Sequence, residues 1–175
     1  MTTVIVGNGP SLKDRELGEK IDSFERVVRI NAAEVKGYEH QVGSKTDVLV
    51  INERFLWYGD EIRIKNVPLL VAVCWWQPLH GCLWQRIAET TDLPLIDEDV
   101  ARESSPYDRG KWPSTGMLAI AHFMRRGTVA IAGFDHFKGG PHHYFNDSVP
   151  ASCHDGEDEA FIVQAWQAEG GLYRL

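Results

Sequence analysis

Apolar runs of strand length recur along the chain and alternate with segments of helical length. Several runs are nearly continuous in Val, Ile and Leu, which is typical of strands that are buried on both faces of a sheet. The predicted strands cover residues 3–7, 26–31, 46–52, 68–74, 93–97, 128–134 and 172–175. The predicted helices cover residues 11–20, 54–64, 78–90, 114–126 and 157–169. The alternation predicts an α/β fold, a single Rossmann-like domain whose mostly parallel sheet of about seven strands is flanked by helices.

Composition agrees with one globular domain over residues 1–175, with 43% hydrophobic and 25% charged residues. The net charge of −7 argues against a general nucleic-acid binder. No apolar run approaches the roughly 20 residues of a membrane-spanning helix, and the N-terminus is typical of a strand rather than a signal peptide. Cys74, Cys82 and Cys153 form no CxxC pair. We therefore expect a cytoplasmic protein without a transmembrane segment, and leave open peripheral attachment to the inner membrane and homo-oligomerisation.

The first predicted strand ends in a glycine-rich turn, Gly7-Asn8-Gly9-Pro10-Ser11-Leu12-Lys13. Gly9 allows close approach of the backbone to a ligand, and Ser11 with Asp14 has the spacing of a capping box that would begin a helix. A helix N-terminus after a glycine turn is a potential anion site. Because Leu12 replaces the last glycine of GxGxxG and no Walker motif is present, we expect a phosphate or nucleotide loop of another kind, with a plain strand–turn–helix as the alternative.

Carboxamides end three of the predicted strands, at Asn8, Asn31 and Asn52. An amide both donates and accepts hydrogen bonds, so such a group can bind a base edge, a ribose or a phosphate. A second candidate anion cradle lies at the start of a helix, in Pro113-Ser114-Thr115-Gly116. Its alternative is an ordinary capped helix.

Four of the seven histidines lie between residues 136 and 154. One interpretation is a metal site formed by His142, His143 and His154, although no fixed ligand spacing is present. Another is a set of surface histidines in a loop. The third is a catalytic site in which one histidine is a base and one stabilises a departing phosphate, since an unperturbed imidazole titrates near neutrality.

Four segments taken together resemble the sialylmotifs of the animal-type sialyltransferases. The long motif is similar to residues 4–46, the short motif to residues 113–134, the third motif to residues 143–146, and the very short motif, His-x4-Glu, to His154 and Glu159. They occur in the family's order and cover most of the chain. The start, Gly-Asn-Gly-Pro-Ser-Leu-Lys, also resembles bacterial sialyltransferases that modify lipooligosaccharide, and we interpret the chain as a short bacterial member.

The resemblance implies a GT-A-like variant of the fold and a glycosyltransferase that moves an acid sugar, such as sialic acid or Kdo, from a CMP-sugar to a glycan or glycolipid hydroxyl. It implies inversion at the anomeric carbon, no metal and no cofactor beyond the donor. His154 would be the general base, and His143 would bind the CMP phosphate. Glu159 would orient that base or cap a helix. With the positions argued above, the candidate substrate-binding residues are Asn8, Gly9, Asn31, Asn52, Ser114, Thr115, Gly116 and Tyr144.

Two departures from the family pattern are visible. Thr3 and residues 127–128 occupy the places of the disulfide that joins its long and short motifs, and Asn146 stands where the family commonly has an acid. Two other functions are compatible with the chain. A metal-dependent nucleotide-sugar transferase could use residues 97–99, Asp-Glu-Asp, and a non-catalytic CMP- or glycan-binding module could use the tryptophans of residues 75–84.

Overall fold

The computed structural model describes residues 1–52, 68–72, 95–96, 111–138, 141–147 and 154–175. Within them, seven strands form one sheet in the order β5-β4-β3-β2-β1-β6-β7, and every pairing is parallel. The strands are β1 (Thr3–Val6), β2 (Arg26–Ile30), β3 (Val48–Asn52), β4 (Leu69–Ala72), β5 (Leu95–Ile96), β6 (Val129–Ala132) and β7 (Leu172–Arg174). Each lies inside a predicted strand, which confirms the α/β class and the parallel sheet.

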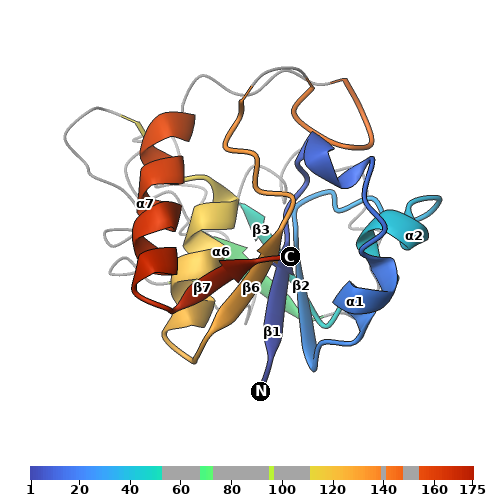
Figure 1. Cartoon of the computed structure of the whole chain (residues 1–175), viewed down its shortest axis with the longest axis horizontal. Helices are drawn as coiled ribbons and strands as arrows, with labels where there is room; N and C mark the ends of the chain where they lie inside the picture. Colours follow the sequence, from blue (N-terminus) through green and yellow to red (C-terminus); the bar gives the residue numbers. More distant parts are fainter. Residues whose placement is uncertain (53–67, 73–94, 97–110, 139–140, 148–153) are drawn as a thin grey trace, which may run out of the picture.

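Helices cover both faces of the sheet (Figure 1). On one face lie α1 (Gly18–Asp22), α2 (Glu39–Val42) and the 3-10 turn η1 (Pro10–Leu12). On the other lie α6 (Thr115–Met124) and α7 (Gly156–Ala168). Alternate residues of each strand therefore enter two different cores. Ile5 packs with α6, whereas its neighbour Val4 packs with the residues around α1.

The helix predictions had mixed outcomes. The predictions for residues 114–126 and 157–169 are confirmed by α6 and α7, whereas α2 was not predicted. The prediction of one helix over residues 11–20 is wrong, because the chain forms the 3-10 turn η1 at the start of this range and the separate helix α1 begins only at Gly18. The predicted capping by Ser11 is also absent, since no side chain caps η1. The predicted helices 54–64 and 78–90 lie outside the described residues.

The order of the strands reverses at β1. From β1 the sheet grows through β2 to β5, and the chain then returns to place β6 on the other side of β1. Such a switch point, at the carboxyl ends of the strands, is where ligands bind in open α/β sheets. No helix among the described residues is long and apolar enough to cross a membrane.

Candidate functional site

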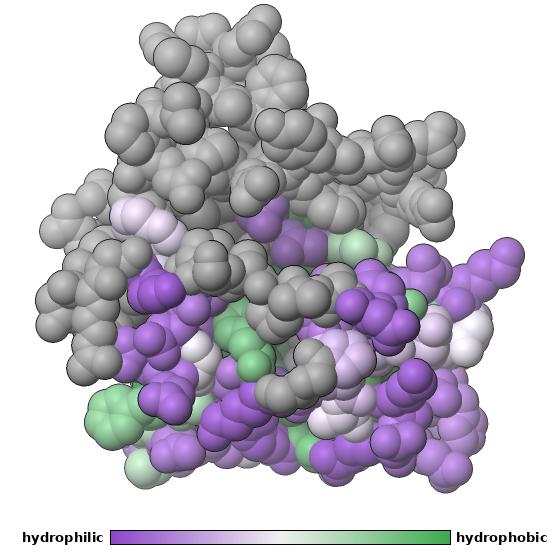
Figure 2. Space-filling model, turned by 90° about the horizontal axis from the view of Figure 1, so that it is seen from above, coloured by the Kyte–Doolittle hydropathy of each residue, from purple (hydrophilic) through white to green (hydrophobic). Residues whose placement is uncertain are grey.

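The three carboxamides lie at the carboxyl ends of β1, β2 and β3, as the sequence predicted, and they connect these strands. Asn8 Nδ2 donates to the Ile30 carbonyl (3.0 Å), and Asn31 Oδ1 accepts from the Asn52 amide (3.1 Å). Asn52 Nδ2 continues the series to Thr115 Oγ1 at the start of α6 (3.3 Å). The network places the switch point and the second predicted cradle next to each other, on the face that Figure 2 shows as mainly hydrophilic where it is described.

The turn after β1 differs from the open anion loop that the sequence predicted. The Gly9 amide donates to the Gly133 carbonyl (2.9 Å), and the Ser11 amide donates to the Asp135 carboxylate (2.8 Å). A Cβ on Gly9 would come within 2.3 Å of Asp135 Oδ2, so glycine is required here for packing against the segment after β6. These two N–H groups are satisfied within the protein, and a ligand contact by Gly9 stays a prediction.

At the N-terminus of α6, the Ser114 amide is likewise bonded within the protein, to the carboxylate of Glu159. Glu159 accepts from the Ser114 amide (2.8 Å) and from its hydroxyl (3.1 Å), while Ser114 Oγ accepts from Met117 (3.3 Å). A Cβ on Gly116 would come within 2.7 Å of the Phe134 ring, so Gly116 permits α6 to pack against the end of β6. Substrate binding by Ser114, Thr115 and Gly116 stays a prediction, and any phosphate at this terminus would share it with Glu159.

His154 has a defined tautomer. Its Nδ1 lies 2.8 Å from the Trp112 carbonyl, and its ring stacks on Phe137 with centroids 5.5 Å apart and planes at 12°. Because a carbonyl can only accept, Nδ1 carries the proton and Nε2 keeps its lone pair in the neutral ring. Burial lowers the pKa of His154, against the effect of the Trp112 hydrogen bond, and Lys111 lowers it further. The ring is therefore a neutral acceptor at pH 7.

His143 lies in the same group of stacked rings. Its ring is 4.3 Å from that of His142 and 4.8 Å from that of Phe145, and Phe137 contacts His142 at 5.0 Å. The series from Phe145 to His154 therefore joins the two predicted catalytic histidines. Burial lowers the pKa of His143, while its hydrogen bond to Asn146 Oδ1 (3.1 Å) raises it. Burial, together with the neighbouring His143 and His154, lowers the pKa of His142 to about 4.

Tyr144 is buried beside the site rather than exposed in it. Its hydroxyl donates to the Glu34 carbonyl, and its amide donates to the Asn8 carbonyl (2.9 Å). Burial raises the pKa of this hydroxyl to about 12. The structure thus shows Tyr144 attaching the histidine segment to the turn after β1, and its predicted contact with a nucleotide stays a prediction.

The metal interpretations receive no support from the described residues, among which no three His, Cys, Asp or Glu side chains form a group able to hold an ion. Three other features considered from the sequence lie outside the described residues: the acidic triplet 97–99, the tryptophans of residues 75–84 and the three cysteines.

Comparisons with known proteins support the resemblance. Residues 1–59 match the profile of glycosyltransferase family 29 (sialyltransferase). The start of the chain is therefore similar to the family 29 sialyltransferases. The mouse CMP-N-acetylneuraminate-beta-1,4-galactoside alpha-2,3-sialyltransferase is 26% identical over 194 residues, which cover 93% of this chain and 50% of that protein. The mouse CMP-N-acetylneuraminate-beta-galactosamide-alpha-2,3-sialyltransferase 1 is 29% identical over 182 residues, which cover 91% and 54%.

The fold also agrees with the sialyltransferases. A crystal structure of a mammalian sialyltransferase in complex with Gal-beta-1-3GalNAc-ortho-nitrophenol superposes with a TM-score of 0.73 at 23% identity, covering 99% of this chain and 68% of the other. The chain spans about half the length of the curated relatives described here. These relatives are mammalian, so the comparisons give no support to the interpretation as a bacterial member. The cytoplasmic location is not tested by them and stays a prediction.

Sequence reasoning underestimated several residues of this site. Asp135, which precedes the histidine-rich stretch, has no local signal of a role, although it accepts a hydrogen bond from the Ser11 amide in the turn after β1. Phe137 and Arg174 had no signal of their own. Glu159 was expected to orient the base or cap its own helix, but it bonds the start of α6 instead, while Asp155 caps α7.

Proposed function

We propose that this chain is a sialyltransferase that transfers sialic acid from CMP-N-acetylneuraminate to a galactoside hydroxyl, with inversion at the anomeric carbon and no metal requirement. The observation that carries the proposal is the placement of His154, whose Nδ1 lies 2.8 Å from the Trp112 carbonyl and whose ring stacks on Phe137. The names of the mouse relatives support the choice of donor and acceptor.

In the proposed reaction the acceptor hydroxyl attacks the anomeric carbon while His154 Nε2 takes the hydroxyl proton. The bond from that carbon to the CMP phosphate oxygen breaks, and its electron pair leaves with CMP. A positioned general base typically contributes about 10²–10⁴-fold to the rate. The neutral state of His154, which burial favours by lowering its pKa, is the state that this step requires.

His143 is proposed to stabilise the departing phosphate. With Nδ1–H bound to Asn146, its Nε2 donates to phosphate only when the ring is protonated. Burial opposes protonation by lowering the pKa of His143, whereas an adjacent phosphate raises the pKa of an imidazole. We therefore expect donor binding and protonation of His143 to occur together. Asn8, Asn31 and Asn52, at the carboxyl ends of β1, β2 and β3, are proposed to bind the nucleotide.

Calorimetric titration with CMP, with UDP, GDP and NAD as controls, tests the proposal in the presence and absence of EDTA. Selective CMP binding that EDTA leaves unchanged, together with acceptor-dependent consumption of CMP-N-acetylneuraminate on β-galactosides, is the expected result. CMP binding without donor consumption on any acceptor would favour a binding module. UDP binding that needs a cation would favour a metal-dependent transferase.

A further inference from the structure

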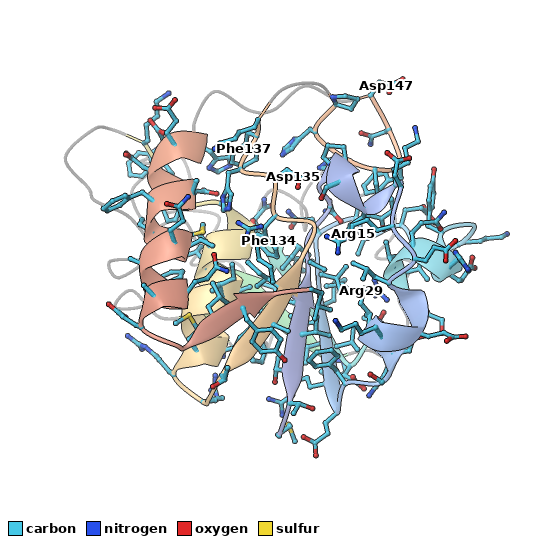
Figure 3. All side chains as sticks on the ribbon, in the orientation of Figure 1. Arg15, Arg29, Phe134, Asp135, Phe137 and Asp147 are labelled. Atoms are coloured by element: carbon cyan, nitrogen blue, oxygen red, sulfur yellow. The ribbon has the colours of Figure 1, made fainter. Side chains whose placement is uncertain are left out.

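The turn after β6, residues 134–137, contacts both the turn after β1 and the ring of His154 (Figure 3). Asp135 bonds the turn after β1, and Phe137 stacks on His154. Between these contacts the backbone of His136 and Phe137 has φ values of 51° and 56°. Non-glycine residues rarely adopt this left-handed region, and they remain there only where surrounding groups hold them.

Arg174, the last residue of β7, holds this turn from the neighbouring strand. Its guanidinium donates through Nη1 to the Phe134 carbonyl (2.9 Å) and through Nη2 to His136 Nε2 (2.7 Å). Because a guanidinium only donates, His136 must accept with a neutral ring. Burial, Arg174 and Lys138 together lower the pKa of His136 to about 4, against the opposite effect of Asp135. The Arg174–His136 bond therefore persists at neutral pH.

The same turn fixes the start of α7, where His154 lies. A Cβ on Gly156 would come within 1.9 Å of the His136 carbonyl oxygen, so the two segments are in direct backbone contact. The Phe137 ring supports one face of His154 while the Trp112 carbonyl holds its Nδ1. A displaced turn would therefore change both the ring support and the helix start that orient this imidazole.

We propose that Arg174 is a positioning residue for His154, acting through the turn formed by residues 134–137. Its catalytic consequence rests on the proposed function, whereas its effect on the imidazole is a property of the folded chain. Among the described residues, Lys111 and His142 are the ionisable groups that interact electrostatically with His154. Neither is substituted in the variants below, so a shift of the His154 pKa in Arg174→Ala reports the position and burial of His154. In Phe137→Leu the His142 resonance must be followed as well, because the Phe137 ring also packs against His142.

Four variants test the proposal: Arg174→Ala, Arg174→Lys, Phe137→Leu and the control Arg126→Ala. Arg126 is a matched control because it also contacts a histidine ring and a carbonyl, those of His122 at the end of α6. The first measurement is an NMR titration of the imidazole resonances. We expect the His154 pKa to rise toward 6.5 in Arg174→Ala and Phe137→Leu, less in Arg174→Lys, and not in the control.

The second measurement is steady-state transfer. We expect kcat to fall about 10- to 100-fold in Arg174→Ala and Phe137→Leu with little change in donor KM, because misplacing a catalytic group has costs of this order. The acid limb of the pH profile should move with the His154 pKa. Arg174→Lys keeps the positive charge but cannot donate to both acceptors in the geometry of the guanidinium. We therefore expect a smaller loss of kcat in Arg174→Lys than in Arg174→Ala.

An unchanged His154 pKa in Arg174→Ala would overturn the inference. Loss of CMP binding in that variant would also overturn it, because Arg174 would then act through Asp135 on the turn after β1 rather than on His154. If Arg174→Ala does not fold, the milder Arg174→Lys and Phe137→Leu variants decide by the same readouts. A wild-type chain without transfer, but with the expected NMR shifts in the variants, would reject the proposed function and support the positioning role.

Discussion

Glu159 in the first turn of α7 binds Ser114 at the N-terminus of α6, so one buried carboxylate joins the beginnings of two helices. It accepts from the Ser114 amide and hydroxyl at 2.8 and 3.1 Å and is only 5% exposed. Because His154 precedes α7 and Thr115 begins α6, this contact keeps the proposed base and the proposed binding elements in one arrangement.

Glu159→Gln should change how stability depends on pH. Burial raises the pKa of Glu159 from 4.5 to about 7, against the Ser114 hydrogen bonds. Between these values the folded state binds more protons than the unfolded state, so this group lowers the free energy of unfolding as pH rises. The variant should lack this decrease, which amounts to about 3 kcal/mol. Urea unfolding at several pH values measures the difference.

The comparison must be made between variant and wild type, because His136 and His142 produce an opposite slope. Their pKa values are lowered to about 4, so their contribution to stability is lost as pH falls below 6.5. They are present in both proteins and cancel in the difference. Parallel stability curves for the two proteins would contradict the raised pKa of Glu159.

His154→Ala should abolish most transfer without abolishing nucleotide binding. Loss of a general base is expected to cost about 10²–10⁴-fold in kcat. CMP affinity, measured by calorimetry, should remain within about threefold of wild type, which is less than 1 kcal/mol. His143→Ala should weaken both. His40→Ala, at an exposed histidine of α2, is the control. Unchanged turnover in His154→Ala would remove this residue from the mechanism.

Asn146→Asp should raise the pKa of His143. In the wild type Asn146 Oδ1 is a neutral partner for His143 Nδ1, 3.1 Å away. A carboxylate at this place would favour the imidazolium, by one pKa unit or more in a partly buried site. The imidazolium can donate through Nε2, so CMP should bind more tightly near pH 7. NMR titration of His143 and calorimetry with CMP check this, and an unchanged pKa would contradict the proposed contact.

Gly116→Ala should destabilise the protein by clashing with Phe134. Its Cβ would lie 2.7 Å from that ring, and overpacking of this kind costs about 1–3 kcal/mol. Addition of Phe134→Leu should recover part of the loss in thermal unfolding and in CMP binding. A role of Gly116 in ligand access alone predicts normal stability in Gly116→Ala and no recovery of CMP binding in the double variant.

The strands were predictable because strands buried on both faces need continuous apolar runs, and the chain has one for each of the seven. The start of α6 was predictable because Ser114 is a local cap that accepts from Met117. The helix from residue 11 was not, because the chain there forms the short turn η1 with Gly9 as its N-cap, and the Ser11 amide bonds to Asp135, 124 positions along the chain. A local capping pattern carries no information about such a distant acceptor.

The sequence by itself determined the parallel sheet, the carboxamides at its strand ends and the two histidines proposed for catalysis. The sheet and the carboxamides follow from local patterns, because the ends of parallel strands meet at one edge of a sheet. The two histidines follow from the resemblance to the sialyltransferase motifs, and their roles stay predictions. Only the tertiary structure decided that Asp135 and Glu159 occupy the amides expected to bind an anion, and that Phe137 and Arg174 support His154. Those contacts join residues 17 to 124 positions apart, and their geometry exists only once the sheet brings β1, β6 and β7 side by side.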